Sequence, residues 1–403
     1  MTLDLRDPAF IVDPYPTWAR IRAEDPVHWS ERHRSWFLTR HADCEAFFAD
    51  PALTADRARA AKGGPVAPRS HRSIGSDPPE HTAVRRLAQR GFTARESEAL
   101  RPRIESMVDR LLDQITQPQP TFRKFGGNSP PNFQKVGQGG GQFDLIRDFA
   151  YPLPITVIAE LFGVPEADRP QFSAWSREMA AAMDRFYSKG AFGGGGMGAY
   201  IAALVAERRR SPGDDLISRM LEAEDDDALT EPEVTSLCTL LVFAGHETTT
   251  NLIGNGVLAL LHAPDQLEAV RKADGAGVRT AVEELLRYDS PAQMINRAAI
   301  ADTTIGGTAI AAGDSVVAAL GAANRDPDCF ARADELDVAR HPNPHLAFGQ
   351  GVHFCLGAAL SRREAQIAVP TLLERFRDLR LTDPPRWRET AVLRGLESLP
   401  VAN

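Results

Sequence analysis

One segment constrains the fold more than any other: a run of mostly apolar residues from Pro232 to His262 that fits a single helix. At about 1.5 Å per residue, roughly 30 residues make a helix about 45 Å long, which is enough to cross a whole domain. The middle of the run reads AGHETTT, so no apolar stretch within it is long enough to span a bilayer. We therefore expect this helix to be central and buried.

The polar interruption in this helix needs an explanation, because an unpaired buried carboxylate is costly. One interpretation is a helix kink, in which threonine hydroxyls bond back to preceding carbonyl groups. Another is an acid-alcohol pair, Glu247 and Thr248, that delivers protons to a buried cavity. A third is metal ligation by His246 and Glu247, although successive helical residues point about 100° apart and cannot easily share an ion. The segment alone leaves the first two interpretations open.

A second segment, FGQGVHFCLGAALSRREAQIAV from Phe348, places Cys355 among glycines immediately before a helical pattern. Gly349, Gly351 and Gly357 would let the backbone approach a flat ligand closely, and backbone N–H groups could point at the cysteine sulfur. A thiolate held in this way is suited to be a ligand. The alternative is a buried free cysteine beside a glycine turn.

Hydrophobic periodicity predicts a mainly α fold with small β-sheets (α+β). Short strand-like runs such as SWFLTR occur early, long helical patterns dominate from Phe143, and strand-like pieces with Gly-Gly and Gly-Asp turns follow Ala292. No linker divides the chain, so we expect one domain over residues 1–403. Two low-complexity stretches, Thr116–Gln142 and Ser188–Tyr200, are predicted to be surface loops, and the first is an insert relative to the family whose resemblance is described below.

Charge and cysteine content narrow the classes of partner. The 403-residue chain has a net charge of -8, which gives no general attraction to nucleic acid. Its four cysteines are widely scattered and indicate reduced thiols. The N-terminal segment is charged and broken by prolines, unlike a signal peptide or membrane anchor. These features predict a cytoplasmic protein that binds neither nucleic acid nor membrane.

The cysteine segment resembles the pattern Phe-x-x-Gly-x-His/Arg-x-Cys-x-Gly of the cytochrome P450 family, through Phe348, Gly351, His353, Cys355 and Gly357. Four weaker segments follow the family's order. They are DPPEHTAVRR from Asp77, AGHETT from Ala244, EELLR from Glu283 and VARHPNPHLAFG from Val338. The resemblance runs nearly end to end and is strongest to soluble bacterial members.

The resemblance implies a haem b group (iron protoporphyrin IX) between the long helix and the helix behind the cysteine loop, with Cys355 as the thiolate ligand of the iron. It implies a buried ion network among Glu284, Arg287 and Arg340. Gly245 would let dioxygen approach the long helix. Other residues expected to contact the haem or its carboxylates are His81, Arg85, Arg297, His353, Ala244, Phe348 and Gly349. Residues expected to line the substrate pocket are those of the loop from about Arg57 to Ile74, and Leu240, Phe243, Met294, Ile295 and Leu396.

The function implied by the resemblance is that of a monooxygenase in bacterial secondary metabolism or catabolism. Such an enzyme activates O2 with two electrons and oxidises a small organic substrate, by hydroxylation or epoxidation, with Glu247 and Thr248 managing protons. The substrate can be free or linked to a carrier or peptide. The chain has no flavin or nicotinamide fingerprint, so electrons from NAD(P)H would arrive through a separate ferredoxin or flavodoxin-like donor.

Docking of an acidic donor is expected on a basic patch on the cysteine side of the haem. The patch residues are Arg85, Arg86, Arg90, Arg362 and Arg363. Two alternatives to simple monooxygenation remain at this point. One is an atypical P450-type oxidation such as ring coupling, desaturation, nitration or peroxygenation, and the other is a haem-binding module without catalysis.

Overall fold

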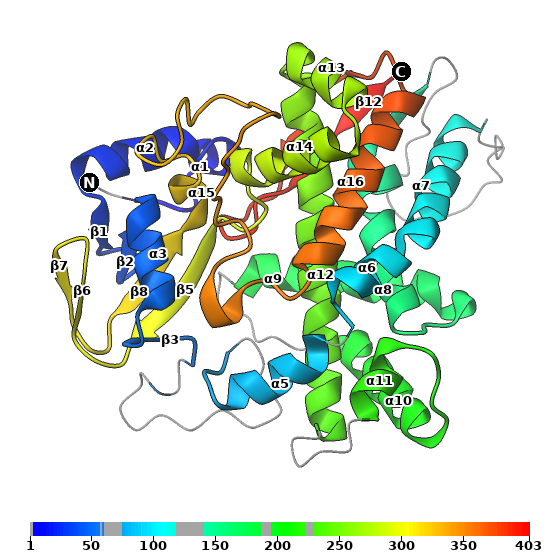
Figure 1. Ribbon diagram of the computed structural model, residues 1–403, viewed down its shortest axis with the longest axis horizontal. Helices are drawn as coiled ribbons and strands as arrows, with labels where there is room; N and C mark the ends of the chain where they lie inside the picture. The colour runs from blue at the N-terminus through cyan, green and yellow to red at the C-terminus, as the bar shows by residue number, and fades with distance from the viewer. Residues whose placement is uncertain are drawn as a thin grey trace, which may run out of the picture.

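The computed structural model has a β-rich part and a larger helical part (Figure 1). The β-rich part combines N-terminal residues with strands that follow residue 294, so segments far apart in sequence lie side by side. The predicted mainly α fold with small sheets is confirmed. The residues that the structure describes are 3–56, 59, 75–89, 91–117, 141–186, 195–222 and 229–403.

Helices make up most of the described chain. The α-helices are α1 (Pro8–Val12), α2 (Tyr15–Glu24), α3 (His41–Ala49), α5 (Glu80–Gln89), α6 (Ala94–Ala99), α7 (Arg101–Thr116), α8 (Pro152–Leu161), α9 (Arg169–Phe186), α10 (Gly195–Arg210), α11 (Leu216–Leu221), α12 (Glu231–Leu261), α13 (Pro264–Lys272), α14 (Gly275–Tyr288), α15 (Leu320–Ala323) and α16 (Ala358–Arg375). Shorter turns are the π-helical η2 (Ile146–Ala150) and the 3-10 helical η3 (Glu166–Asp168) and η4 (Gly351–His353). Within the described ranges, no helix combines the length and apolar content needed to cross a bilayer.

The strands within the described ranges form four small sheets. They are β1 (Val27–Ser30), β2 (Ser35–Leu38), β3 (Leu53–Thr54), β4 (Gln142–Asp144), β5 (Met294–Ala299), β6 (Thr303–Ile305), β7 (Thr308–Ile310), β8 (Ser315–Ala319), β9 (Arg380–Leu381), β10 (Arg386–Trp387), β11 (Leu396–Ser398) and β12 (Pro400–Ala402). The largest sheet has the order β1-β2-β8-β5-β3, in which only the β2-β8 pair is parallel. The strands predicted after Ala292 are confirmed, and Gly306 and Gly307 form the tight β6-β7 turn with φ of 56° and 79°.

The long central helix α12 matches the segment that most constrained the sequence. Thr230 and Glu233 form a reciprocal capping box at its start, and Pro232 occupies its first turn, where a missing N–H costs nothing. Helices α8, α10, α14 and α16 pack against it, and most of its residues are buried. The helix is therefore central, and its stability comes from packing on several sides.

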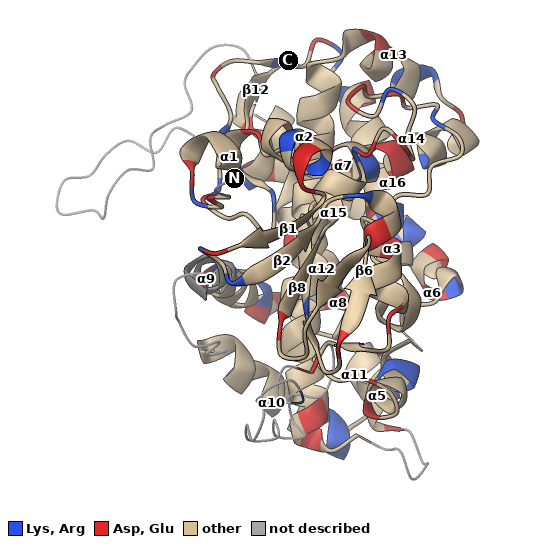
Figure 2. Cartoon of the chain, turned by 90° about the vertical axis from the view of Figure 1, so that its left-hand side faces the viewer, with Lys and Arg blue, Asp and Glu red and all other residues tan. Residues whose placement is uncertain are grey.

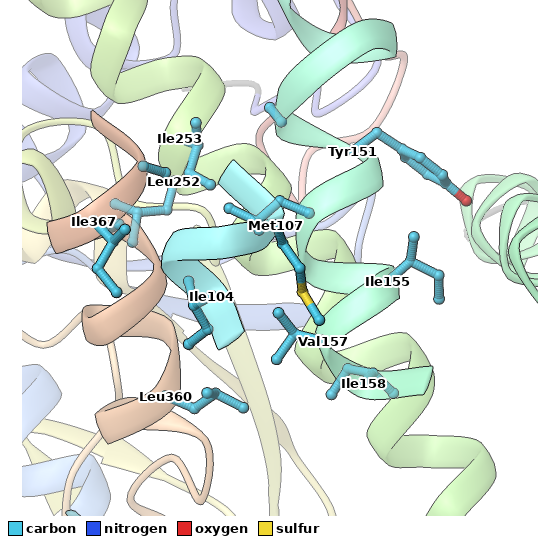
Figure 3. Packing of buried hydrophobic residues seen from close by; sticks show 14 of the residues in the cluster. Ile104, Met107, Tyr151, Ile155, Val157, Ile158, Leu252, Ile253, Leu360 and Ile367 are labelled. Carbon is cyan, nitrogen blue, oxygen red and sulfur yellow. The ribbon is translucent and has the colours of Figure 1, made fainter. Parts of the chain in front are cut away.

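The main hydrophobic core lies where α7, α8, α12 and α16 meet (Figure 3). Their apolar side chains interdigitate around α12, which fixes the position of each helix against its neighbours. The side chains labelled in Figure 3 are Ile104, Met107, Tyr151, Ile155, Val157, Ile158, Leu252, Ile253, Leu360 and Ile367. Two smaller cores fill the β-rich part.

Both predicted loops extend less far than expected. Thr116 is the last residue of α7 and Gln142 the first of β4, and residues 118–140 between them lie outside the described residues. Residues 195–200 of the glycine-rich stretch belong to α10, because Met197 and Ile201 share the face that this helix buries. Gly196 is needed there, since a Cβ atom would come within 2.1 Å of Trp175 Nε1.

Candidate active site

The loop before α16 holds Cys355 in a fixed position. The Cys355 N–H donates to the Phe348 carbonyl at 2.9 Å, which closes the loop on itself. Gly349 and Gly351 adopt φ of 67° and 73°, a left-handed conformation that disfavours residues with a Cβ. Three residues after the cysteine, α16 begins at Ala358, so the thiol lies close to the N-terminal end of a long helix.

Competing influences act on the Cys355 thiol. Burial raises its pKa, while a backbone N–H of Gly357 and the charges of Arg85 and Arg362 lower it. Each of the latter groups favours the thiolate, as does the positive end of a helix. A single half-buried thiolate with backbone donors suits a ligand of a haem iron, and the loop therefore fits the group that the resemblance implied.

Basic side chains from three elements gather beside this loop. The imidazole rings of His81 on α5 and His353 in the cysteine loop lie 4.1 Å apart, and Asp77 Oδ1 is 3.9 Å from His353 Nε2. Burial, with His81 and Arg297 nearby, lowers the pKa of His353 to about 4. His353 Nε2 is buried and has no hydrogen-bond partner among the described residues. Such a cluster fits a ligand that carries carboxylate groups.

Arg297 reaches the same region from β5. Its Nη1 donates to the Phe47 carbonyl at 3.0 Å, and its guanidinium lies 4.9 Å from the centre of the Phe47 ring. Burial lowers its pKa, opposed by Asp77 and Asp50. A buried guanidinium oriented in this way suits recognition of a second carboxylate.

A stripe of half-buried residues runs along the otherwise buried middle of α12. Leu240, Ala244, Gly245 and Thr248 are partly accessible, whereas most residues around them are buried, including Phe243. Leu240, Ala244 and Thr248 are four residues apart and share one helix face, so these three face a single space, whereas Gly245 is turned toward α8. Thr249 Oγ1 lies 3.1 Å from Ser361 Oγ, which brings the start of α16 alongside the middle of α12. The predicted acid-alcohol segment and the cysteine loop are therefore close in space.

The two interpretations that the sequence left open for this segment are compatible. The Thr248 hydroxyl donates to the Ala244 carbonyl at 2.7 Å, as in a threonine that bonds back along its own helix. The same bond holds the hydroxyl on the accessible stripe, where its oxygen can accept a further hydrogen bond. The threonine is thus both a local helix feature and a candidate proton-handling group.

Glu247 is buried, with 2% of its side chain exposed, and it has a cationic partner that the sequence did not predict. Nη1 of Arg388 donates to Glu247 Oε2, from the loop between β10 and β11. No local signal marks Arg388, because it lies 141 residues away along the chain. The pairing explains how α12 can hold a carboxylate in its interior.

His246, the neighbour of Glu247, makes protein contacts. Its Nδ1 lies 3.0 Å from Ser176 Oγ on α9, and its ring meets the edge of Tyr151 at 4.3 Å. Burial, with Arg388 and Arg177 nearby, lowers its pKa to about 3, so the ring is neutral near pH 7. These contacts join α9 to α12 and give no support to a shared metal ion at His246 and Glu247.

Three residues expected at the haem or in the pocket also make contacts with the protein core in this structure. Leu396 is packed in the main core, where its Cδ1 lies 3.9 Å from the Cβ position of Gly254. Gly254 follows Ala244 by ten residues on α12, which separates the two by about 15 Å along the helix. Met294 faces the N-terminal core, whereas Ile295 lies 3.8 Å from the Cβ position of Gly349. The Cβ position of Gly245 is 2.9 Å from Ile158 Cδ1, so this glycine permits close packing of α8.

Two residues that the sequence did not suggest, Val392 and Leu393, become candidates for the pocket wall because they are less buried than Leu396. Val392 and Leu393 are half-buried and lie beside the start of β5. The Gln293 N–H donates to the Val392 carbonyl at 2.8 Å, and Leu393 forms a β-bridge with Ala292. The predicted pocket loop, residues 57–74, lies outside the described residues except for Arg59.

The predicted buried ion network is confirmed. Glu284 accepts from Arg287 at 2.7 and 2.8 Å and from Arg340 at 3.1 Å, and the Asp337 N–H and the Asn343 amide donate to it as well. Both arginines also donate to backbone carbonyls between Asn324 and Glu335. The network ties α14 to the segment that leads into the cysteine loop.

The predicted basic patch is partly neutralised. Arg362 makes two 2.7 Å bonds to Glu283 and lies 4.4 Å from the centre of the Phe348 ring, while Arg363 pairs with Glu98. Arg90 lies outside the described residues. Seen from the β-rich side, basic and acidic residues are interspersed over the molecule (Figure 2).

Comparison with known proteins agrees with this arrangement. A family model described as Cytochrome P450 matches residues 199–274 and 278–397. Cytochrome P450 107B1 of Saccharopolyspora erythraea is 41% identical over 98% of this chain and 96% of that protein. Cytochrome P450 monooxygenase PikC of Streptomyces venezuelae is 39% identical, covering 97% and 91%.

Solved structures show the same relationship. The structure of PksS, a cytochrome P450 of the bacillaene polyketide synthase of Bacillus subtilis 168, has a TM-score of 0.87 and 37% identity, and covers 100% of this chain and 99% of that one. The structure of P450BioI in complex with an acyl carrier protein has a TM-score of 0.84 and 37% identity, and covers 98% and 100%. With such similarity over nearly its whole length, the chain belongs to the cytochrome P450 family.

Proposed function

We propose that this P450 monooxygenase holds haem b through Cys355 and oxidises a small organic substrate of bacterial secondary metabolism, by hydroxylation or epoxidation. The observation that carries the proposal is the juxtaposition of two features. The half-buried thiol lies on a glycine-framed loop, and the accessible stripe of α12 carries Thr248 close to the start of α16.

Haem, when bound, supplies the redox-active iron at which dioxygen is reduced. The chain's own residues hold and orient it. Cys355 provides the thiolate, and the cationic and imidazole groups beside it would receive the two carboxylates. These groups are His81, Arg85, Arg297 and His353. Ala244, Phe348 and Gly349 would contact the flat faces of the ring.

Protons reach the site through Glu247 and Thr248. Glu247 lies in the interior and pairs with Arg388, whose side chain is 18% exposed, so this contact leads from the buried carboxylate toward the surface. Thr248 is the next residue and faces the stripe. An acid and an alcohol placed in this order can pass a proton inward while water is kept out.

Electrons would come from NAD(P)H through a separate ferredoxin or flavodoxin-like protein. Because Arg362 and Arg363 are already paired, we place the docking surface around two exposed apolar residues of the cysteine loop. Val352 is 55% exposed and Phe354 39% exposed, and Arg86 supplies charge nearby on α5. Electron transfer that is insensitive to salt and to Phe354→Ser would exclude this surface.

The substrate side of the site is apolar. Leu240, Phe243 and Ile295 would line it together with Val392 and Leu393. A carrier-linked substrate fits the proposal, since one structural neighbour is a complex with an acyl carrier protein. All four cysteines are free, which supports a cytoplasmic location.

The test of the proposal is the spectrum of the reduced carbon-monoxide complex. The parent protein should show the red-shifted band of thiolate ligation, and Cys355→Ser should lose it while retaining the fold by circular dichroism. Cys329→Ser is the matched control, because that thiol is also partly exposed but lies outside the loop. A red-shifted band that persists in Cys355→Ser would overturn the assignment.

A further inference from the structure

The contact between Arg388 and Glu247 joins two distant parts of the chain. Arg388 Nη1 donates to Glu247 Oε2, and the carboxylate is almost completely buried. We propose that Arg388 is a positioning residue that holds the Glu247 carboxylate in the orientation used for proton transfer. The inference deepens the proposed function and rests on Glu247 acting as the proton relay.

The backbone that carries Arg388 is itself held in place. The Arg388 N–H donates to the Gly395 carbonyl at 3.1 Å, across the base of the loop between β10 and β11. The Arg394 guanidinium lies 3.7 Å from the centre of the Trp387 ring, and its Nε donates to Asp289 at 2.6 Å. The guanidinium of Arg388 therefore reaches α12 from a segment that these contacts hold in place.

The chemistry of arginine defines what this contact can do. A guanidinium stays protonated under all ordinary conditions, so Arg388 cannot itself pass protons to Glu247. It can fix one carboxylate oxygen by a charged hydrogen bond and favour the ionised form that accepts a proton from water. Other polar groups near Glu247 are His246 on the same helix and Tyr151, whose pKa is raised by burial to about 12, so both rings are neutral near pH 7.

The loop that carries Arg388 also reaches the proposed substrate pocket. Its tip, with the half-buried Val392 and Leu393, lies beside the start of β5. Arg388 stands at the base of the same loop. One short segment thus contacts both the pocket wall and the proton relay, and this places Arg388 where its loss would alter proton delivery.

The first test measures dioxygen consumption by the haem-loaded enzyme, driven by NADPH with a surrogate ferredoxin and its reductase and without added substrate. Arg388→Gln should slow consumption roughly tenfold, the size expected when one charged hydrogen bond is lost. It should also increase the solvent deuterium isotope effect, because proton delivery becomes slower. Arg388→Lys keeps the charge without the planar fork and should recover part of the rate. Arg386→Gln is the matched control, since this exposed arginine lies two residues away.

A second measurement needs no turnover. In a double-mutant cycle of thermal unfolding, Arg388→Gln and Glu247→Gln together should lower the melting temperature by less than the sum of the single changes. Additive changes, or a parental isotope effect and rate in Arg388→Gln, would overturn the inference. If Glu247→Gln itself leaves dioxygen consumption unchanged, then the proposed relay fails instead, whatever Arg388 does.

Discussion

Glu284 on α14 and Glu247 on α12 are both buried carboxylates on long helices, but their surroundings differ. Glu284 accepts hydrogen bonds from two arginines, a backbone N–H and an amide, and its side chain is completely buried. Glu247 is 2% exposed and pairs with Arg388, a partly exposed residue of the loop between β10 and β11. A carboxylate saturated by fixed partners holds the fold together, whereas the proposed relay requires Glu247 to exchange protons, and its contact with the partly exposed Arg388 is consistent with that role.

The largest effect should come from breaking the saturated site. Glu284→Gln leaves Arg287 and Arg340 buried without a counter-charge, and we expect a loss of about 3–5 kcal/mol in the free energy of unfolding. Denaturant unfolding of the haem-loaded protein measures it. Glu268→Gln is the matched control, because Glu268 pairs with Arg271 at the same spacing on α13 but is 48% exposed, and it should cost much less. Equal losses would remove the distinction between saturated and partly exposed carboxylates.

Glu247→Gln should lower the free energy of unfolding only a little but should lower dioxygen consumption strongly. Its amide oxygen can still accept from Arg388, so we expect a stability loss of only about 1–2 kcal/mol. Dioxygen consumption should fall about tenfold, since an amide cannot relay protons. Both quantities are measured on one preparation. A loss as large as that of Glu284→Gln with normal dioxygen consumption would mean that Glu247 is structural.

The pH dependence of stability gives a third contrast. The pKa of His246 is about 3 in the fold, against about 6.5 in an unfolded chain, so the unfolded state binds more protons between these values. Stability should therefore fall as pH decreases from about 6.5, by roughly 1–2 kcal/mol at pH 5. His246→Asn should remove this part of the slope. An unchanged slope in the variant would show that His246 is protonated in the fold.

The smallest effect concerns a third buried carboxylate. Glu364 on α16 is 1% exposed, its Oε2 has no hydrogen-bond partner among the described residues, and burial raises its pKa well above the usual range. Its stability contribution is therefore retained at acid pH and lost as pH rises through the folded pKa. Glu364→Gln should stabilise the protein by about 1 kcal/mol at pH 7 and by less near pH 4. Destabilisation at pH 7 would indicate an ionised, solvated Glu364.

Local patterns predicted the parts of the fold that depend on local physics. The bounds of α12 follow from its apolar run and its capping residues, and the strands after Ala292 follow from short apolar runs between glycine turns. The glycines around Cys355 predicted a tight loop for the same reason. These features need only the neighbours of each residue in sequence.

The errors arose where distant segments meet. Arg388 cannot be assigned to Glu247 without knowing how the β10-β11 loop lies on α12. Val392 and Leu393, proposed for the pocket in place of Leu396, lie only a few residues from it in a region without strong motifs. Met294 and Ile295 are adjacent in one strand, so their assignment depends on which face of the sheet meets the core. Such details are set by packing.

The most direct test of the account compares Thr248→Ala with Thr249→Ala. The two threonines are adjacent, but Thr248 lies on the accessible stripe, whereas Thr249 is buried against Ser361. With a test compound selected because it shifts the haem absorption, the measurement is hydrogen peroxide released and product formed per dioxygen consumed. The account predicts more peroxide and less product in Thr248→Ala, with near-parental partition in Thr249→Ala. Parental coupling in Thr248→Ala would contradict it and leave the polar middle of α12 as a structural feature.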